Sequence, residues 1–365
     1  MLAVKDPKRS AKGNRHSILH HHDAACDYRG NCPLPSSPWT VTALEEEKHM
    51  LDVKQQYLYG RPTSSCFSQS WRSTQYRASE AAFSSVLAVN AVPPLRRRFL
   101  PYGSRTVTQQ NVQLSPKGSL SAFLDYLATL QVPHRYFTHF YVVSVTSSAL
   151  WAQEILRNGR LFSAIAALAP KIDPSKAMSK EQILLTWALM SAQGCRRLYE
   201  SIRLAKPSNA KMWFVHWFLG WAFYAGMGLA VWVEGIQTLR STPLKVALSS
   251  PSLRTAIFLP LFLFASWMQN KCHRHLASLK KYSLPTHPFF RYITCPHYTA
   301  ECLIYLSLAG IAAPPGQAFN KTILASLVFT AVNLGVTAET TRQWYVEKFG
   351  EDKVTALWRM IPFVY

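Results

Sequence analysis

Apolar residues form blocks that alternate with polar segments over the last 230 or so positions of the chain. The clearest block, residues 212–233, has 22 positions with one His and no charged residue. A helix of this length can cross the roughly 30 Å hydrocarbon core of a bilayer. Further apolar blocks occupy residues 136–156, 183–195, 255–268, 298–314 and 322–338. The pattern predicts an all-α integral membrane protein, a bundle of about six or seven transmembrane helices.

Two of the blocks are short for this role. Residues 183–195 and 255–268 reach across a bilayer only if the helices tilt or continue beyond the membrane interface. Residues 1–94 contain no apolar run of 18 residues and are expected to be mostly disordered. The chain is therefore divided into this polar region, N-terminal membrane helices over residues 95–245 and a C-terminal membrane domain over residues 246–365.

Many basic residues lie just beyond the ends of the apolar blocks. The formal net charge of +21 and the pI near 9.8 are typical of nucleic-acid-binding proteins. However, basic residues such as Arg157, Arg196, Lys271 and Arg342 lie just beyond apolar blocks, where the positive-inside rule and anionic headgroups explain them. Nucleic acid is therefore not predicted as a partner, whereas a nucleotide cofactor with several phosphates remains compatible with the charge.

Histidine and cysteine near the N-terminus do not predict a metal site. Their spacing fits no strong zinc pattern, and the chain's seven Cys show no disulfide framework. The residues considered are His20, His21, His22, Cys26 and Cys32.

Four polar patches interrupt the apolar half of the chain, each at the end of a block. Taken singly, each patch could be an interfacial anchor of Trp, Tyr, Lys and Arg. Their common position favours a second interpretation, in which they line one polar cavity open to the cytosol. The patches are residues 132–141, residues 193–200, residues 269–275 followed by Lys280 and Lys281, and residues 296–301, the last joined by residues 342–349 and 361–365.

The fourth patch places His297 and Glu301 one helical turn apart at the start of an apolar block. Pro296 suits the first helical position and Thr294 can cap the helix, so we expect the helix to begin here. A carboxylate in an apolar span is costly and usually marks a functional site. The alternative is that Glu301 lies at the lipid headgroups or pairs with a neighbouring Arg.

Several runs of the sequence resemble the steroid 5-alpha-reductase family. Over the last hundred residues these are Tyr292-Ile-Thr-Cys-Pro-His-Tyr-Thr-Ala-Glu301, Gln343-Trp-Tyr-Val-Glu-Lys-Phe349 and Ile361-Pro-Phe363. The runs at residues 132–141 and 196–200 are similar to the polyprenol reductase branch of this family. The resemblance covers residues from about 95 to 365.

The resemblance implies a multi-pass enzyme of the endoplasmic reticulum membrane with a cytosol-facing cofactor cavity. It implies that NADPH saturates a carbon–carbon double bond beside a carbonyl in a polyprenyl lipid, during dolichol synthesis for protein N-glycosylation. Family matching places the cofactor contacts at Arg197, Gln269, His273, Lys280, His297, Tyr298, Glu301 and Tyr345. Lys280 and Arg197 carry charges that can neutralise phosphates.

The reaction itself limits the substrate. A hydride added to the β-carbon of an enal leaves negative charge on the carbonyl oxygen, which needs a hydrogen-bond donor, and the α-carbon needs a proton. An allylic alcohol offers no such electron sink, so polyprenal is favoured over polyprenol. Steroid-acting relatives hold the carbonyl with a Glu and a Tyr, but Gly194 stands where that Tyr would be and no Glu lies near Val142. His139 and Tyr141 are the nearest replacements, unless both are membrane-interface residues.

Other interpretations remain open at this level. The family usually has one more apolar helix before Pro101-Tyr-Gly103, and only residues 79–93 are a candidate for it. A steroid 4-dehydrogenase, a membrane methyltransferase similar to isoprenylcysteine carboxyl methyltransferase, and a non-enzymatic scaffold are rival functions.

Residues 212–233 carry further polar and aromatic side chains. His216 is interpreted as a helix–helix hydrogen-bonding residue. Trp213, Trp217 and Trp221 recur every four residues, so they form a single stripe that favours packing or lipid contact. Gly220, Gly226 and Gly228 are expected to permit close helix approach.

Overall fold

The computed structural model describes residues 119–169, 173–206, 209–241, 252–280, 283–354 and 356–365. The region predicted to be disordered, residues 1–94, and the candidate first helix, residues 79–93, lie outside these ranges. The described part is mostly helical, as predicted, with one short two-stranded sheet.

Six long helices correspond to the six apolar blocks. They are α5 (Thr138–Leu156), α7 (Lys180–Arg203), α8 (Phe214–Val233), α10 (Leu253–Ser278), α11 (Pro296–Ile311) and α12 (Lys321–Phe349). Within the described residues, α8 and α12 are long and apolar enough to cross a membrane by length and composition. The two blocks that were short in the sequence are continued as helix, since α7 has 24 residues and α10 has 26.

Short elements connect the long helices. The short helices are α4 (Ser119–Thr129), α6 (Arg160–Leu168) and α9 (Ile236–Ser241). The 3₁₀ turns are η2 (His134–Phe137), η3 (Pro174–Lys176), η4 (Pro288–Phe290) and η5 (Glu351–Lys353). The strands β1 (Gln131–Pro133) and β2 (Lys211–Trp213) pair antiparallel, with Val132 opposite Met212. This pairing brings the beginnings of α5 and α8 together, because α8 follows β2 directly and α5 follows β1 after the short turn η2.

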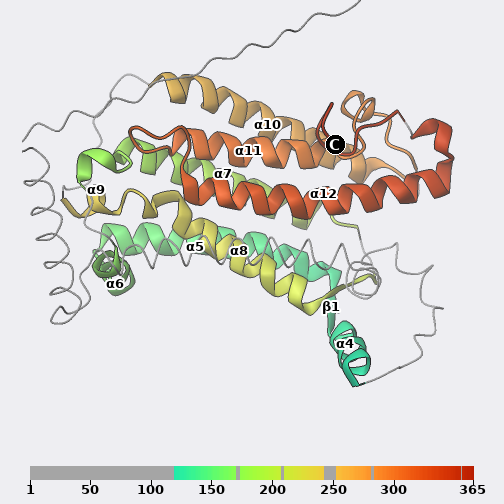
Figure 1. The fold of residues 1–365 in the computed structure, drawn as a ribbon, viewed down its shortest axis with the longest axis horizontal. Helices are drawn as coiled ribbons and strands as arrows, with labels where there is room; N and C mark the ends of the chain where they lie inside the picture. Colours follow the sequence, from blue (N-terminus) through green and yellow to red (C-terminus); the bar gives the residue numbers. More distant parts are fainter. Residues whose placement is uncertain (1–118, 170–172, 207–208, 242–251, 281–282, 355) are drawn as a thin grey trace, which may run out of the picture. The chain divides into compact units, whose positions relative to one another are not determined.

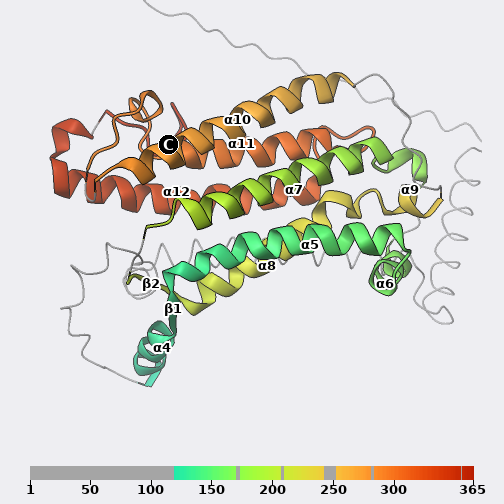
Figure 2. The same cartoon turned by 180° about the vertical axis from the view of Figure 1, so that it is seen from behind.

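The long helices pack in two groups linked by α7. Helix α11 packs on both α10 and α12, and α5 packs on both α7 and α8. Helix α7 also contacts α11, and α8 contacts α12, so the two groups close on each other (Figure 1). The view from behind shows α7 between α11 and the α5–α8 pair (Figure 2). The beginnings of α5, α8 and α11 and the ends of α7, α10 and α12 lie at one end of the bundle.

Side-chain caps fix the opposite end of the bundle. Ser179 and Gln182 form a capping box at the start of α7, and Gln182 Nε2 donates 2.9 Å hydrogen bonds to the carbonyls of Ile311 and Ala313. Asn320 caps α12 by accepting from the Ile323 N–H. These bonds satisfy helix-end groups that would otherwise lack partners.

Glycine lets α5 approach its neighbours closely. A Cβ at Gly228 would collide with Ser147 Oγ, and a Cβ at Gly194 would lie 2.7 Å from Ser144 Oγ. The predicted close approach is confirmed at Gly228, but it is wrong for Gly226, where an added Cβ would meet no atom within 4 Å. Any larger residue at Gly194 or Gly228 would push helices apart and change the positions of side chains between them.

Helix α11 begins at Pro296, as predicted, but the predicted cap is wrong. Cys295 occupies the N-cap position and makes no side-chain capping hydrogen bond. Instead, the backbone N–H groups of Thr294 and Cys295 donate to the carbonyls of Trp358 and Arg359 at 2.7 and 3.0 Å. The C-terminal segment thus holds the start of α11 in place.

Candidate active site

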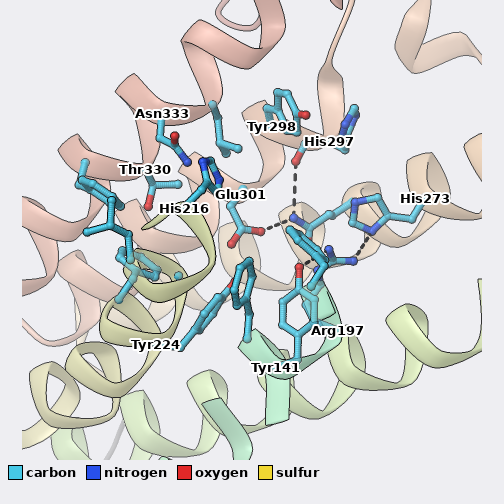
Figure 3. A pocket seen from close by; sticks show the side chains of 18 of the residues that line it. Tyr141, Arg197, His216, Tyr224, His273, His297, Tyr298, Glu301, Thr330 and Asn333 are labelled. Atoms are coloured by element: carbon cyan, nitrogen blue, oxygen red, sulfur yellow. Dashed lines mark hydrogen bonds between the residues drawn. The ribbon is translucent and has the colours of Figure 1, made fainter. Parts of the chain in front are cut away.

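One cavity of about 290 Å³ lies at the end of the bundle where α11 begins (Figure 3). All six long helices contribute to its wall. This volume is just below the about 300–1,000 Å³ typical of ligand pockets, so it suits the reacting parts of larger molecules. It is lined by Phe137, Phe140, Tyr141, Arg197, Trp213, Val215, His216, Leu219, Gly220, Phe223, Tyr224, Gln269, His273, His297, Tyr298, Glu301, Phe329, Thr330, Asn333 and Leu334.

The fold brings seven of the ten predicted site residues together in this cavity, although they come from four helices. They are Tyr141 on α5, Arg197 on α7, Gln269 and His273 on α10, and His297, Tyr298 and Glu301 on α11. The convergence follows from the packing of α7 and α10 ends against the start of α11.

Three predicted site residues do not line the cavity. His139 stacks on Tyr136 with ring centroids 4.6 Å apart and meets Trp217 edge-on at 6.2 Å. Lys280 is exposed just beyond the end of α10. Tyr345 packs against Trp344 and Phe349 near the end of α12. The aromatic setting of His139 agrees with the alternative of an interface residue.

Arg197 is the centre of the polar wall. Its Nη2 donates to the Tyr141 hydroxyl oxygen at 2.5 Å, and its Nη1 donates to Glu200 Oε2 at 2.5 Å. Nη1 also lies 2.7 Å from His273 Nδ1. The guanidinium carbon lies 4.7 Å from the Tyr141 ring centroid, a cation–π distance. Arg197 therefore ties three helices together and faces the cavity with part of its charge.

Glu200 neutralises this cluster from behind the cavity wall. It is 3% exposed and accepts from Arg196, Arg197 and, at 2.6 Å, from Asn270 Nδ2. Glu200 lies beyond the apolar residues 183–195 of its helix. Burial alone raises the pKa of its carboxyl, but the His273 hydrogen bond and the two Arg charges outweigh burial and hold the pKa well below its usual range.

His273 lies beyond the apolar residues 255–268 of α10 and is uncharged at neutral pH. Burial, followed by the positive charge of Arg197, lowers the pKa of His273 to about 4, although the nearby Glu200 opposes this shift. A neutral imidazole has one donor and one acceptor nitrogen. Since His273 Nδ1 donates to Glu200 Oε2 at 2.7 Å, the neutral ring can offer Nε2 as an acceptor to a ligand without adding positive charge.

Gln269 holds Glu301 in a defined orientation. The Gln269 carbonyl oxygen accepts from Arg196 at 2.5 Å and from Gln193 at 2.9 Å. Its amide nitrogen must then face the other way, where it donates to Glu301 Oε2 and, at 3.5 Å, to the His297 carbonyl. The sequence left open whether Glu301 meets headgroups or an Arg; its partner here is a neutral amide, which leaves the carboxylate able to accept from a ligand.

The other half of the cavity is apolar and aromatic. Phe137, Phe140, Phe223 and Phe329 line it, and the Phe223 and Phe329 rings stack at 5.6 Å. Leu219 lines the cavity and is 36% exposed, so the apolar wall continues to the outer surface of the bundle. An apolar chain can therefore lie against this wall with a polar head at Arg197 and Glu301.

Several lining residues were not predicted as site residues. His216, interpreted above as a helix–helix residue, and Tyr224 lie on α8; Thr330 and Asn333 lie on α12. Figure 3 shows His216, Thr330 and Asn333 on the side of Glu301 away from Arg197. Helical spacing contained the signal, since positions 216 and 224 are eight residues apart and positions 330 and 333 are three apart, each pair on one helix face.

The tryptophan stripe divides between two environments. Trp213 lines the cavity, whereas Trp217 and Trp221 pack on each other at 5.3 Å, and Trp221 is 40% exposed. The prediction of packing or lipid contact thus describes Trp217 and Trp221.

Among the described residues, no group of three or more His, Cys, Asp or Glu could hold a metal ion.

The chain is similar in sequence to a family model and to several polyprenal reductases. Residues 210–365 match the family model described as 3-oxo-5-alpha-steroid 4-dehydrogenase. A polyprenal reductase of Saccharomyces cerevisiae is 29% identical over 73% of this chain and 85% of its own length. Polyprenal reductase 1 of Oryza sativa subsp. indica is 27% identical over 74% of this chain and 89% of its own length. A polyprenal reductase of Xenopus tropicalis is 26% identical over 66% of this chain and 82% of its own length. The rival methyltransferase and scaffold functions are not favoured by these matches.

Proposed function

We propose that the chain is a member of the steroid 5-alpha-reductase family, whose model matches residues 210–365, and that it is an NADPH-dependent reductase of polyprenal. It saturates the α-isoprene double bond of a long-chain polyprenyl lipid in dolichol synthesis, which supports protein N-glycosylation. The observation behind this proposal is the joining of two walls in one cavity: a polar wall around Arg197 and Glu301 and an aromatic wall that reaches the bundle surface.

The polar wall fits the nicotinamide part of NADPH. The amide nitrogen of a carboxamide carries two N–H donors, and Glu301 and the unprotonated nitrogen of neutral His273 can accept from them. His297 and Tyr298, with ring centroids 4.2 Å apart, offer aromatic surface beside them. When bound, NADPH supplies a hydride. Lys280, outside the cavity, is proposed to meet the phosphates, and Tyr345 remains a predicted contact.

Tyr141 is the group we assign to the carbonyl oxygen of the substrate. Its hydroxyl oxygen accepts from Arg197, so its own proton can be donated toward the cavity. The Arg197 charge stabilises a Tyr141 oxygen that shares its proton with a developing oxyanion. An aldehyde conjugated to the double bond can carry such a charge, and an allylic alcohol cannot. Polyprenal is therefore the proposed substrate.

The membrane arrangement is a further part of the proposal. The family is membrane-bound, and α8 and α12 have the length and composition of membrane spans. We place the apolar parts of α5, α7, α10 and α11 beside them in the bilayer of the endoplasmic reticulum. Lys271, Arg274 and Lys348 lie at the end of the bundle that holds the cavity, and the positive-inside rule puts that end in the cytosol.

The direct test is an assay of the purified full chain in detergent with NADPH. Polyprenal, polyprenol of the same length and a 3-oxo-4-ene steroid are compared, following NADPH loss and the mass of the product. We expect NADPH loss with polyprenal and a product saturated at the α-isoprene unit. Turnover of polyprenol alone would overturn the carbonyl requirement, and turnover of the steroid alone would overturn the substrate class.

Replacement of Glu301 by Gln is expected to lower kcat/KM for NADPH by about 10–100-fold, because a charge-assisted hydrogen bond to a ligand is lost. The measurement is initial rate against NADPH concentration. Glu347→Gln, an exposed position on α12, is the matched control and should behave as wild type. Equal activity of both variants would contradict the role of Glu301, and it would favour a protein whose polar patches only anchor helices.

A further inference from the structure

Residues 358–365 fold back along α12 and leave two apolar side chains exposed. Phe363 is 86% exposed and Val364 is 76% exposed, although the backbone around them is closed into a turn by hydrogen bonds between Ile361 and Tyr365. Trp358 lies beside them, with its ring centroid 5.6 Å from that of Phe363. Apolar side chains that gather on the outside of an ordered segment indicate a surface that meets lipid or another molecule.

Contacts with α12 fix the level of this segment along the bundle. Met360 packs in a buried cluster with Ala338. The Tyr365 hydroxyl donates to the Gly335 carbonyl at 3.4 Å, and a Cβ at Gly335 would lie 3.5 Å from the Tyr365 ring. These positions of α12 are the last turns of its apolar residues 322–338. Figure 1 accordingly shows the C-terminus set back from the red end of α12.

Charged residues of the same contact mark a boundary. Arg359 pairs with Glu339, which is the first charged residue of α12 after the apolar residues 322–338. Aromatic and Arg side chains are typical of the level at which a membrane protein passes from hydrocarbon to headgroups. If α12 spans a bilayer, this level is the membrane interface, and the exposed side of Phe363 and Val364 lies at it.

The opposite side of the segment holds the start of α11. The backbone N–H groups of Thr294 and Cys295 donate to the carbonyls of Trp358 and Arg359, and the Thr299 hydroxyl donates to the next carbonyl of the segment. The cofactor contacts proposed for α11 lie between these bonds or within one turn of them. The position of this part of the cavity wall therefore depends on the position of residues 358–365.

We propose that residues 358–365 form a membrane-interface anchor, in which Phe363 and Val364 insert at the headgroup level of the bilayer and thereby hold the start of α11. The inference rests on the proposed membrane arrangement. Its partner is phospholipid, because the exposed side chains lie level with the end of the apolar residues of α12, where a spanning helix is surrounded by lipid. Loss of this lipid contact loosens the wall that carries His297 and Glu301.

The first test places a photoreactive side chain at three levels of the full chain in phosphatidylcholine nanodiscs. Val328, Phe363 and Glu347 are replaced by p-benzoylphenylalanine in separate variants, and mass spectrometry after irradiation detects the mass of an added lipid. Val328 is exposed within the apolar part of α12, and Glu347 is exposed beyond it. We expect lipid adducts at Val328 and Phe363 and none at Glu347. An adduct at Val328 without one at Phe363, or a cross-link from Phe363 to a second protein chain, would overturn the anchor.

The second test measures amide hydrogen exchange over residues 292–301 in the same nanodiscs. Phe363→Asn removes the apolar ring and suits the backbone φ of 63° at this position, since Asn adopts positive φ readily. We expect exchange in this peptide to become about 10-fold faster, because the segment loses the burial of an aromatic ring in lipid. Phe363→Leu keeps an apolar side chain and should exchange as wild type does. Ile202→Asn, at an exposed apolar position near the end of α7, is the matched control and should also leave the rate unchanged.

The outcomes separate the anchor from the function on which it rests, because neither measurement uses NADPH or polyprenal. Unchanged exchange in Phe363→Asn, or an equal rise in Ile202→Asn, overturns the holding of α11 by the anchor. A chain that reduces polyprenal but gives no lipid adduct at Phe363 overturns the anchor alone. Lipid adducts at Phe363 in a chain that reduces no polyprenal support the anchor and overturn the proposed reaction alone. Absence of adducts at both Val328 and Phe363 overturns the membrane arrangement and the anchor together.

Discussion

Replacement of Tyr141 by Phe is expected to lower kcat for polyprenal by about 10²–10³-fold, the usual effect of removing one preorganised oxyanion donor. The Phe ring fills the same space beside Phe137 and Tyr224, so the apolar wall and the KM for polyprenal should change little. Arg197 would lose one acceptor and keep Glu200 as its partner. The effect should therefore appear in the chemical step, measured as single-turnover NADPH oxidation.

Tyr136→Phe is the matched control, because Tyr136 lies near the start of α5 and is not in the cavity wall. A parallel His139→Phe variant compares the two donors that the sequence left open. If His139→Phe lost the single-turnover rate and Tyr141→Phe kept it, the assignment of the oxyanion donor to Tyr141 would be wrong.

Replacement of Glu200 by Leu is expected to lower the free energy of unfolding by about 3–5 kcal/mol. The change leaves the guanidinium groups of Arg196 and Arg197 without their carboxylate in a wall where Glu200 is 3% exposed. Asn270 and His273 lose the same acceptor. The measurement is thermal unfolding of the purified protein in detergent at one fixed lipid content.

Glu339→Leu is the comparison for Glu200→Leu. Glu339 pairs with Arg359, but their side chains are 23% and 33% exposed, and a pair of this kind contributes about 1 kcal/mol or less. The expected order of stability is wild type, then Glu339→Leu close below it, then Glu200→Leu far below. An equal loss in both variants would contradict the view that Glu200 neutralises a buried cluster.

The start of α11 could be predicted closely from the sequence, whereas the cavity wall beside it could be predicted only in part. Pro296 as the first helical residue and the shared face of His297 and Glu301 follow from local rules of helix geometry. Thr294 has the chemistry of a cap but does not cap the helix, because its backbone is paired with the returning segment at Trp358. That pairing joins residues more than 60 positions apart, which no local pattern contains.

The sequence by itself determined the helical class and the positions of six long helices, because apolar periodicity and helix-end residues act within a few turns of the chain. It also indicated most of the polar residues of the cavity, mainly through the resemblance to the steroid 5-alpha-reductase family, whereas the cost of a carboxylate in an apolar span by itself pointed to Glu301 and the adjacent His297. Only the tertiary structure decided which faces meet. Helix rotation depends on close packing at positions such as Gly194 and Gly228, and this rotation puts Tyr224 toward Tyr141 while His139 lies among aromatic residues outside the cavity.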